Sequence, residues 1–365
     1  MRNSRWGSAE PMSQNSLLGR ILALGLAGAL AVMVPAAAGA QDAGWGHERP
    51  GFARQYFPEP PTGGNRASLG EKLFFDTRLS RTGATACASC HRPEYAFAEP
   101  RPVSISDNGR RGERNAPSLV NVGYLPILMW DGRLRSLESQ ALSPFRRGEM
   151  GISVEEAEYR LRRDPEYVYL FDLAFGRPPS AQGLAAALAA YQRTLVSAES
   201  RFERFLRTSD PRILTPLERD GYAIFDGRAP CSNCHHFSKP PADACCQTPL
   251  LLTDWQFHNL GIGYRSGRFA DLGRYSVTGR ERDVGAFRTP ALRNLDPTGP
   301  YMHDGSLATL EEVVEFYDRG GRANPYLSPL LRPLFLTSYE KAALVAFLRS
   351  LNDPQFAHVG AAERW

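Results

Sequence analysis

The sequence contains no uninterrupted apolar segment long enough to form a membrane-spanning helix. Its longest apolar run, residues 21–34, ends at Pro35 and falls short of the roughly 20 apolar residues that a spanning helix needs. Three arginines precede this run and Ala38-Gly39-Ala40 follows it, which is the pattern of an export signal with an A-x-A cleavage site. We therefore expect cleavage after Ala40, a mature chain that starts near Gln41, no stable membrane insertion afterwards, and a periplasmic location.

A large excess of charge of one sign is also absent. The formal net charge is +4, and it falls to +2 without residues 1–40, because that segment carries three arginines and Glu10. A balance this close to neutral gives no sign of a polyanionic partner. We expect no nucleic-acid partner.

Alternation of apolar and polar residues, which is typical of strands, is scarce, and helical periodicity dominates. Leu184, Leu188, Tyr191 and Leu195 fall at the spacing of one buried helix face. Ser or Thr followed by Glu three residues later marks several helix starts. The pattern predicts a mainly α fold with helices near residues 154–174, 181–198, 216–226, 310–318 and 338–351.

Long stretches rich in Gly, Pro, Arg and Asn separate these helices, notably residues 99–126 and 238–300. Loops of that length in a folded domain are usually functional or wrap a large group, and a haem is large enough. The mature chain of about 325 residues fits two domains. From a break near residues 207–214 we predict a signal peptide at 1–40, an N-terminal domain at 41–208 and a C-terminal domain at 209–365.

Cysteine is scarce, and the six cysteines do not have the spacing of a disulfide framework. Cys87, Cys90 and His91 form one C-x-x-C-H motif, and Cys231, Cys234 and His235 form a second. This motif attaches haem covalently, because two thiols reach the two vinyl groups of one porphyrin edge and the adjacent imidazole reaches the iron. A zinc site would not require a His after each second Cys, and a thioredoxin-like motif would need a preceding strand. Cys245 and Cys246 form an adjacent pair to which the pattern assigns no role.

With these motifs in place, residues 69–351 resemble the bacterial dihaem cytochrome c peroxidases and the related MauG-type enzymes. Six further landmarks carry the resemblance: Arg114-Asn115-Ala116-Pro117, Trp130-Asp131-Gly132-Arg133, Gln140-Ala141, Gly148-Glu149-Met150-Gly151, Thr289-Pro290-Ala291-Leu292-Arg293-Asn294 and Tyr301-Met302-His303-Asp304-Gly305. The resemblance implies two cytochrome-c-like, mainly helical domains that meet at an interface, and two haem c groups. The N-terminal haem would react with peroxide, and the C-terminal haem would relay electrons.

The resemblance also implies roles for individual residues. Trp130 would carry charge between the haems, and Glu149 and Gln140 would lie on the open side of the first haem, where a carboxylate can move a proton between the oxygens of peroxide. Asn115 and the carbonyls of Thr298 and Pro300 match a calcium site between the domains, and oxygen ligands suit calcium. Simpler interpretations remain open: Trp130 as a core aromatic residue, Glu149 as a solvated loop charge, and His258 and His303 as hydrogen-bonded structural histidines.

Three positions depart from the peroxidase pattern. The loop at residues 104–112 has no His, so we expect the first haem to be open without prior reduction. Tyr317 stands where peroxidases carry a Met ligand to the second haem, as in MauG-type enzymes, and it shares a predicted helix face with Leu310, Val313 and Val314. The alternative for Tyr317 is a core residue with a hydrogen-bonded hydroxyl group. Ala229 replaces a Trp of MauG, which puts the same protein substrate in doubt.

These observations favour a hydrogen-peroxide-dependent dihaem peroxidase or oxidase with MauG-like His/Tyr ligation of the second haem. Its electrons would come from a protein partner, either a small cytochrome c or copper protein, or a protein substrate that it matures. The alternatives are a conventional cytochrome c peroxidase that detoxifies peroxide, and a non-catalytic dihaem electron carrier. A carrier would need both irons six-coordinate.

Overall fold

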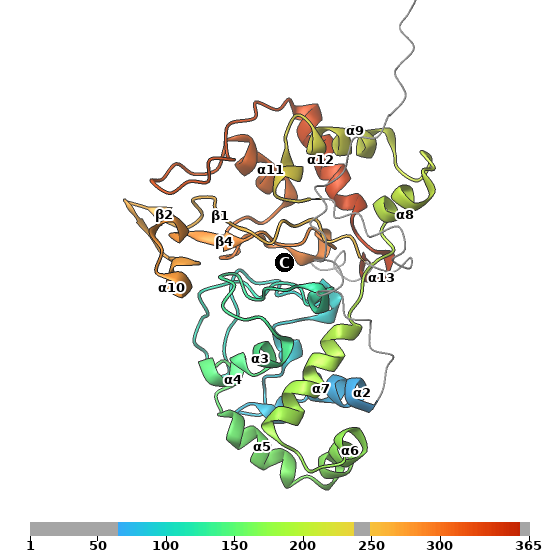
Figure 1. The fold of residues 1–365 in the computed structure, drawn as a ribbon, viewed down its shortest axis with the longest axis vertical. Coiled ribbons are helices and arrows are strands. Elements are labelled where there is room, and N and C mark those ends of the chain that lie inside the picture. Colours follow the sequence, from blue (N-terminus) through green and yellow to red (C-terminus); the bar gives the residue numbers. More distant parts are fainter. Residues whose placement is uncertain (1–64, 237–248, 358–365) are drawn as a thin grey trace, which may run out of the picture. The chain divides into compact units, whose positions relative to one another are not determined.

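The computed structural model describes residues 65–236 and 249–357 (Figure 1). The predicted export signal and the Cys245-Cys246 pair lie outside these residues. The described chain is mainly helical, as predicted, and none of its helices is long and apolar enough to cross a membrane. The α-helices are α2 Asn65–Phe75, α3 Leu137–Ala141, α4 Ser143–Arg147, α5 Val154–Arg162, α6 Pro165–Phe175, α7 Ala181–Thr194, α8 Arg201–Thr208, α9 Pro216–Asp226, α10 Tyr275–Thr278, α11 Leu310–Asp318, α12 Ser338–Ser350 and α13 Pro354–Ala357.

The described strands are short and form two antiparallel pairs. β1 (Phe257–Asn259) pairs with β4 (Ala286–Arg288), and β2 (Tyr264–Arg265) pairs with β3 (Arg268–Phe269). The residues around them are irregular, as expected for the long loops. β4 matters for the site, because its last residue, Arg288, contacts Trp130.

The predicted helices at 216–226 and 310–318 have the predicted bounds, and the last predicted helix ends one residue early, at Ser350. The single helix predicted at 154–174 is two helices. Asp164 interrupts it, because its side chain accepts the backbone N–H of Glu166 at 2.9 Å and Pro165 has no N–H to continue the previous helix.

The helix predicted at 181–198 stops at Thr194 because a distant residue binds the chain that follows. The backbone N–H of Asn121 donates to the carbonyl of Leu195 at 2.7 Å, and its side chain donates to the carbonyl of Ser197 at 2.8 Å. Helices α2, α3, α4, α8, α10 and α13 were not predicted from the sequence.

Two hydrophobic cores organise the described residues. The first core contains buried side chains between Leu69 and Leu195 together with Phe356, and the second core contains buried side chains between Phe202 and Leu351. Phe202 lies on α8, before the predicted domain boundary at residues 208 and 209. That boundary therefore stays a prediction.

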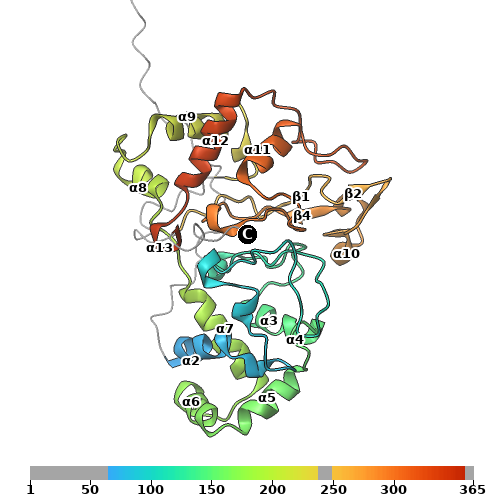
Figure 2. The ribbon, with the colours of Figure 1, turned by 180° about the vertical axis from the view of Figure 1, so that it is seen from behind.

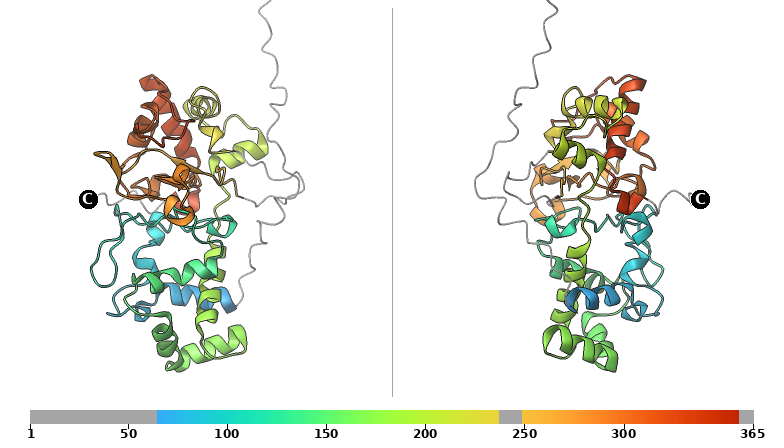
Figure 3. Two further views of the ribbon diagram at one scale, coloured as in Figure 1. Left: turned by 60° about the vertical axis from the view of Figure 1, so that its left-hand side comes forward. Right: turned by 90° about the vertical axis from the view of Figure 1, so that its right-hand side faces the viewer.

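Each core contains one close crossing of two helices. In the first core, α2 crosses α7 at Gly70, where a Cβ would lie 1.9 Å from the carbonyl oxygen of Ala187 (Figure 2). In the second core, α9 crosses α12 at Gly221, where a Cβ would lie 1.9 Å from the carbonyl oxygen of Ala343 (Figure 3). Only glycine allows so close an approach. The two halves thus share a helix pair as well as the Cys motif, although the motif is the only repeat evident in the sequence.

Candidate functional site

The two C-x-x-C-H motifs have the same backbone structure. Each begins with a short 3-10 turn, Cys87–Ser89 in one and Cys231–Asn233 in the other. The N–H of His91 donates to the carbonyl of Cys87, and that of His235 donates to the carbonyl of Cys231, both at 2.9 Å. This local geometry follows from the motif itself, because every bond in it spans four residues or fewer. The two cysteines and the histidine of each motif all line a cavity.

Each motif histidine is held by its Nδ1 atom. Nδ1 of His91 lies 3.1 Å from the carbonyl oxygen of Phe97, and Nδ1 of His235 lies 2.9 Å from that of Leu252. A histidine that donates Nδ1–H to a carbonyl presents Nε2 as a metal ligand in a fixed orientation. Burial lowers the pKa of His91, although its hydrogen bond to Phe97 opposes this, and burial lowers the pKa of His235 to about 4. Both rings are therefore neutral, which is the state that binds iron.

The four motif cysteines form no disulfide bond. Burial raises the pKa of the Cys87 and Cys231 thiols to about 12 and that of Cys90 to about 11. Redox-active C-x-x-C pairs instead have lowered thiol pKa values. These thiols therefore do not suit thiol exchange, and they fit attachment to an apolar group.

Both motifs line one cavity of about 870 Å³. Its wall is mainly apolar, and it includes every predicted site residue: Cys87, Cys90, His91, Asn115, Trp130, Gln140, Glu149, Cys231, Cys234, His235, Thr298, Pro300 and Tyr317. Four buried side-chain atoms have no hydrogen-bond partner among the described residues, and the residues that carry them all line this cavity: Gln140 Oε1, Glu149 Oε2, Gln192 Oε1 and Arg293 Nε. Buried polar atoms are rarely left unpaired unless a bound group or water pairs with them. The residues present therefore fit two large, mainly apolar groups such as haems.

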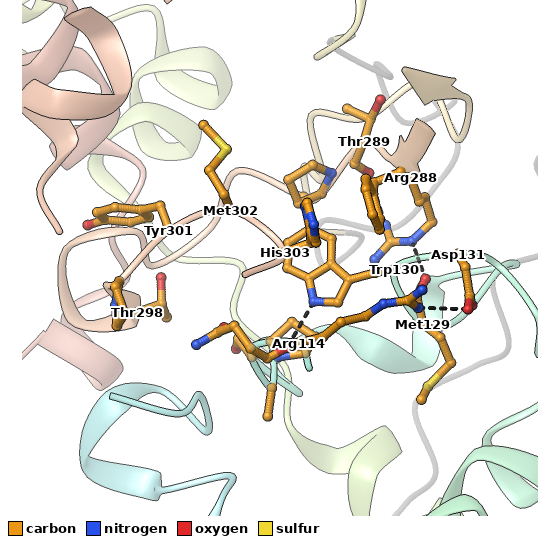
Figure 4. Close-up of a pocket in the computed structure, with 18 of the residues that line it drawn as sticks. Arg114, Met129, Trp130, Asp131, Arg288, Thr289, Thr298, Tyr301, Met302 and His303 are labelled. Carbon is orange, nitrogen blue, oxygen red and sulfur yellow. Dashed lines mark hydrogen bonds and ion pairs between the residues drawn. The ribbon is translucent and has the colours of Figure 1, made fainter. Parts of the chain in front are cut away.

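Trp130 is hydrogen-bonded to one residue from each half of the described chain. Its indole Nε1–H donates to the carbonyl of Asn115 at 2.9 Å, and its own carbonyl accepts the N–H of Arg288 at 2.8 Å (Figure 4). A backbone carbonyl accepts a hydrogen bond but is too weak a base to take the indole proton. The ring is therefore fixed in position with its N–H retained.

The two carboxylate oxygens of Glu149 have different surroundings. Oε1 lies 3.7 Å from Nε of Arg147, whereas Oε2 is buried and unpaired. Burial raises the pKa of Glu149, and the opposing backbone bond and the charges of nearby arginines do not cancel that effect. A carboxyl with a raised pKa and one free oxygen in the cavity can exchange a proton there.

The loop at residues 104–112 folds back on itself and holds Glu149. The N–H of Gly112 donates to the carbonyl of Ser104 at 2.8 Å, which closes the loop. Asp107 accepts from the Thr82 hydroxyl at 2.6 Å, and its N–H donates to the carbonyl of Glu149 at 2.8 Å. Asp107 is thus a positioning residue that the sequence did not reveal, because its partners lie 25 and 42 residues away.

Tyr317 faces the second motif. It lies on α11 with Leu310, Val313 and Val314, and all four line the cavity, so the predicted helix face is confirmed. Its hydroxyl group has no hydrogen-bond partner within residues 65–236 and 249–357. Burial raises the pKa of Tyr317, and the thiols of Cys231 and Cys234 add to the effect. Loss of the hydroxyl proton of Tyr317 would require a bound cation.

His258 and His303 differ in their hydrogen bonding. Nε2 of His258 lies 2.8 Å from Asp254 Oδ2, and this bond, with a further contribution from Cys234, raises the pKa of His258 to about 10. Cys234, Asp254 and His258 are close enough to hold an ion, but Cys234 belongs to the second motif. The ring of His303 instead stacks on Phe287 with 3.6 Å between centroids. Within the described residues, its ring nitrogens make no hydrogen bond.

The residues matched to a calcium site are brought together only in part. Asn115, Thr298 and Pro300 line the same cavity, and Thr298 lies near Tyr301 (Figure 4). The amide nitrogen of Asn115 donates to the carbonyls of Glu99 and Arg101 at 3.3 and 2.9 Å, which leaves its amide oxygen for another partner. The amide oxygen of Asn115 and the carbonyl oxygens of Thr298 and Pro300 are ligands of the kind that calcium prefers.

Two like motifs, one beside each core and both open to one apolar cavity, define a dihaem protein. Residues 64–211 match the family described as di-haem cytochrome c peroxidase. The chain is 38% identical over 312 residues to cytochrome-c peroxidase IdrP1 of Denitromonas iodatirespirans, covering 80% of this chain and 82% of that protein. It is 36% identical over 290 residues to the methylamine utilization protein MauG of Methylorubrum extorquens, covering 79% and 78%.

Solved structures give the same result. A MauG-like protein associated with microbial copper homeostasis matches with a TM-score of 0.72 and 34% identity, over 83% of this chain and 97% of that one. The diheme peroxidase BthA of Burkholderia thailandensis matches with a TM-score of 0.70 and 26% identity, over 84% and 89%. The chain belongs to the di-haem cytochrome c peroxidase family. It is a dihaem peroxidase, and the family implies two haem groups.

Proposed function

We propose that this enzyme reduces hydrogen peroxide at the site of His91, with Glu149 as acid and base, and that Tyr317 is the second ligand at the site of His235. The observation that carries the proposal is that two buried oxygens, Glu149 Oε2 and Gln140 Oε1, are unpaired at the cavity that both motifs line. A pure electron carrier has no use for unpaired polar atoms beside its haem. An enzyme that binds peroxide needs them.

The chain's own residues account for the proton movements. Reduction of one peroxide to two waters consumes two electrons and two protons. Glu149 would take the proton from the near oxygen of peroxide and return it to the far oxygen, which leaves as water. Gln140 would hold the peroxide by a hydrogen bond. The haems supply the electron storage and the iron that peroxide binds, as in the family.

Trp130 would link the two sites by passing an electron without passing a proton. Its N–H is bonded to the Asn115 carbonyl, which cannot accept the proton. Tyr317 would give up its hydroxyl proton and bind as an anion, which favours oxidised iron over reduced iron. An anionic Tyr ligand at the second haem would distinguish a MauG-like enzyme from a conventional peroxidase, which has a Met ligand there.

The remaining features of the proposal rest on the sequence and on the cavity. The two haems would be attached covalently through Cys87, Cys90, Cys231 and Cys234, and calcium would bind Asn115, Thr298 and Pro300. The two domains would divide near residue 208. The enzyme would work in the periplasm, and its electrons would come from a small cytochrome c or copper protein, or from a protein substrate that it matures.

The test is the ferric EPR spectrum of the purified protein, followed by addition of peroxide. We expect one high-spin haem, open at the His91 site, and one low-spin haem, and we expect peroxide consumption without prior reduction. Two low-spin signals and no reaction with peroxide would identify an electron carrier. A reaction that requires prior half-reduction would favour the conventional cytochrome c peroxidase.

A further inference from the structure

Two arginines are buried within the described residues, and only one of them has a counter-ion there. Arg293 is 5% exposed and its Nη1 lies 2.7 Å from Glu203 Oε2. Arg288 is 6% exposed, and no described carboxylate lies within ion-pair distance of it. Burial lowers the pKa of Arg288 to about 10 without any opposing charge, so the guanidinium is still a cation at neutral pH.

The contacts of Arg288 fix its position without neutralising it. Nη1 donates to the carbonyl of Thr289 at 2.9 Å, and Nε lies 3.5 Å from the carbonyl of Met129. Its backbone N–H donates to the carbonyl of Trp130. An unpaired buried cation is strongly unfavourable unless an anion joins it. Arg288 is therefore held in one position as a cation, and no described anion pairs with it.

The missing anion must reach Arg288 from the cavity. Arg288 lines the cavity beside Trp130, and His303 lies close by (Figure 4). His303 stacks on Phe287, the residue before Arg288, and burial lowers its pKa to about 4, so it is a neutral ring. The charged fork of Arg288 and the neutral ring of His303 together suit a carboxylate, since arginine binds carboxylates through two N–H groups.

We propose that Arg288 is the counter-ion of a haem propionate at the junction of the two haem sites, and that it sets the reduction potential of that haem. Haem is the group of this family that brings carboxylates into the cavity. The proposal depends on haem binding and not on the reaction with peroxide. Arg288 would act as a positioning residue, because the carbonyls of Met129 and Thr289 hold its guanidinium group at the cavity wall.

The test compares three variants of the haem-loaded protein by spectroelectrochemistry, under anaerobic conditions and without peroxide. Arg288→Gln removes the charge, Arg288→Lys keeps it, and Arg212→Gln removes a charge from an arginine whose side chain is 88% exposed. Loss of a nearby cation stabilises ferric over ferrous haem. We expect Arg288→Gln to lower the reduction equilibrium constant of one haem by about tenfold, which is about 59 mV for one electron. The other two variants should stay close to the wild type.

Resonance Raman spectra give a second measurement, because the propionate bending mode should shift in Arg288→Gln and not in Arg212→Gln. If Arg288→Gln fails to retain haem while Arg288→Lys retains both haems, the required charge is confirmed by haem content alone. Unchanged potentials and an unchanged propionate mode in Arg288→Gln would overturn the proposal. So would an Arg288→Lys variant that loses haem or shifts as far as the Gln variant. These outcomes would overturn the role of Arg288 and would leave the proposed peroxide reduction at Glu149 untouched, because that reaction is measured separately.

Discussion

The guanidinium group of Arg114 donates from Nε to Asp271 Oδ2 at 2.6 Å, and from Nη1 to Asp131 Oδ2 at 2.7 Å. Asp271 follows Arg114 by 157 residues, and Trp130 directly precedes Asp131. The side chains of Arg114 and Asp271 are 20% and 16% exposed. This arginine therefore ties the segment that carries Trp130 to the segment between β3 and β4.

We predict that Asp271→Asn destabilises the protein by about 1–3 kcal/mol, because it removes one charge from a mostly buried network and leaves Arg114 with Asp131 alone. Burial by itself would raise the pKa of Asp271, but the hydrogen bond and charge of Arg114 outweigh it, and its pKa is lowered. Its contribution is therefore present above the unfolded pKa of about 4 and is lost as pH falls below it. Urea unfolding from pH 7 to pH 3 should show the difference between variant and wild type shrink in acid. A constant difference would exclude the charge as the cause.

We predict that Trp130→Phe leaves both haems in place but slows communication between them. The phenyl ring is harder to oxidise and cannot donate to the Asn115 carbonyl. After peroxide is mixed with the protein, the spectral response of the second haem should slow by about tenfold or more, equivalent to roughly 1.4 kcal/mol of barrier. Trp255→Phe is the matched control, since Trp255 does not line the cavity. If the second haem responds equally fast in both variants, Trp130 is a core aromatic residue and does not carry charge between the haems.

We predict that Glu149→Gln slows the bimolecular reaction with peroxide by roughly 10²–10⁴-fold, the usual scale for loss of a general acid or base. The amide keeps the shape and removes the titratable proton. Because burial raises the pKa of Glu149, the wild-type rate should fall as pH drops through a value above 4.5, and this limb should vanish in the variant. Stopped-flow mixing across pH measures both effects. Glu155→Gln, on the exposed side of α5, should behave as the wild type.

We predict that Tyr317→Met raises the reduction potential of the second haem, because a neutral thioether replaces an anionic oxygen. The variant should also require prior half-reduction before it consumes peroxide. Spectroelectrochemistry of the purified ferric protein measures the potential. Tyr339→Phe removes the hydroxyl group of a tyrosine that is 57% exposed and should leave both potentials unchanged. If Tyr317→Met also leaves both reduction potentials unchanged, Tyr317 does not bind iron.

We predict that Cys87→Ala or Cys231→Ala lowers the number of fully attached haems from two to one, because each motif needs both of its thiols. Mass spectrometry of mature protein should show two haems on a wild-type chain that begins near Gln41. Cys245→Ala and Cys246→Ala serve as controls and should retain both. Wild-type protein with the mass of the bare polypeptide would contradict covalent attachment.

Part of this site can be predicted from the sequence because it depends on near neighbours. The two C-x-x-C-H turns close through bonds from each His to the Cys four residues before it. The cavity-facing side of α11 follows from helical spacing, which places Tyr317 with Leu310, Val313 and Val314. The helix at 216–226 has its start marked by Thr215 and Glu218, whose mutual capping bonds form as the pattern indicates.

The rest depends on partners that are far away in the sequence. Asp164 with Pro165 divides a continuous helical pattern, and Asn121 ends α7 by binding the chain beyond it. Gly70 and Gly221 are unremarkable in the sequence, and only the crossing helices require them.

The two motifs, the family resemblance and the helices α5, α6, α7, α9, α11 and α12 could be predicted from the sequence, because chain spacing and local hydrogen bonds suffice for these. Which buried polar groups lack partners depends on the folded arrangement of distant segments. Arg288 and Arg293 lie five residues apart, yet Glu203 neutralises Arg293 across 90 residues, whereas Arg288 lines the cavity with no described carboxylate paired to it. The free energy of a buried charge depends on every group within a few ångströms, and folding alone chooses those groups.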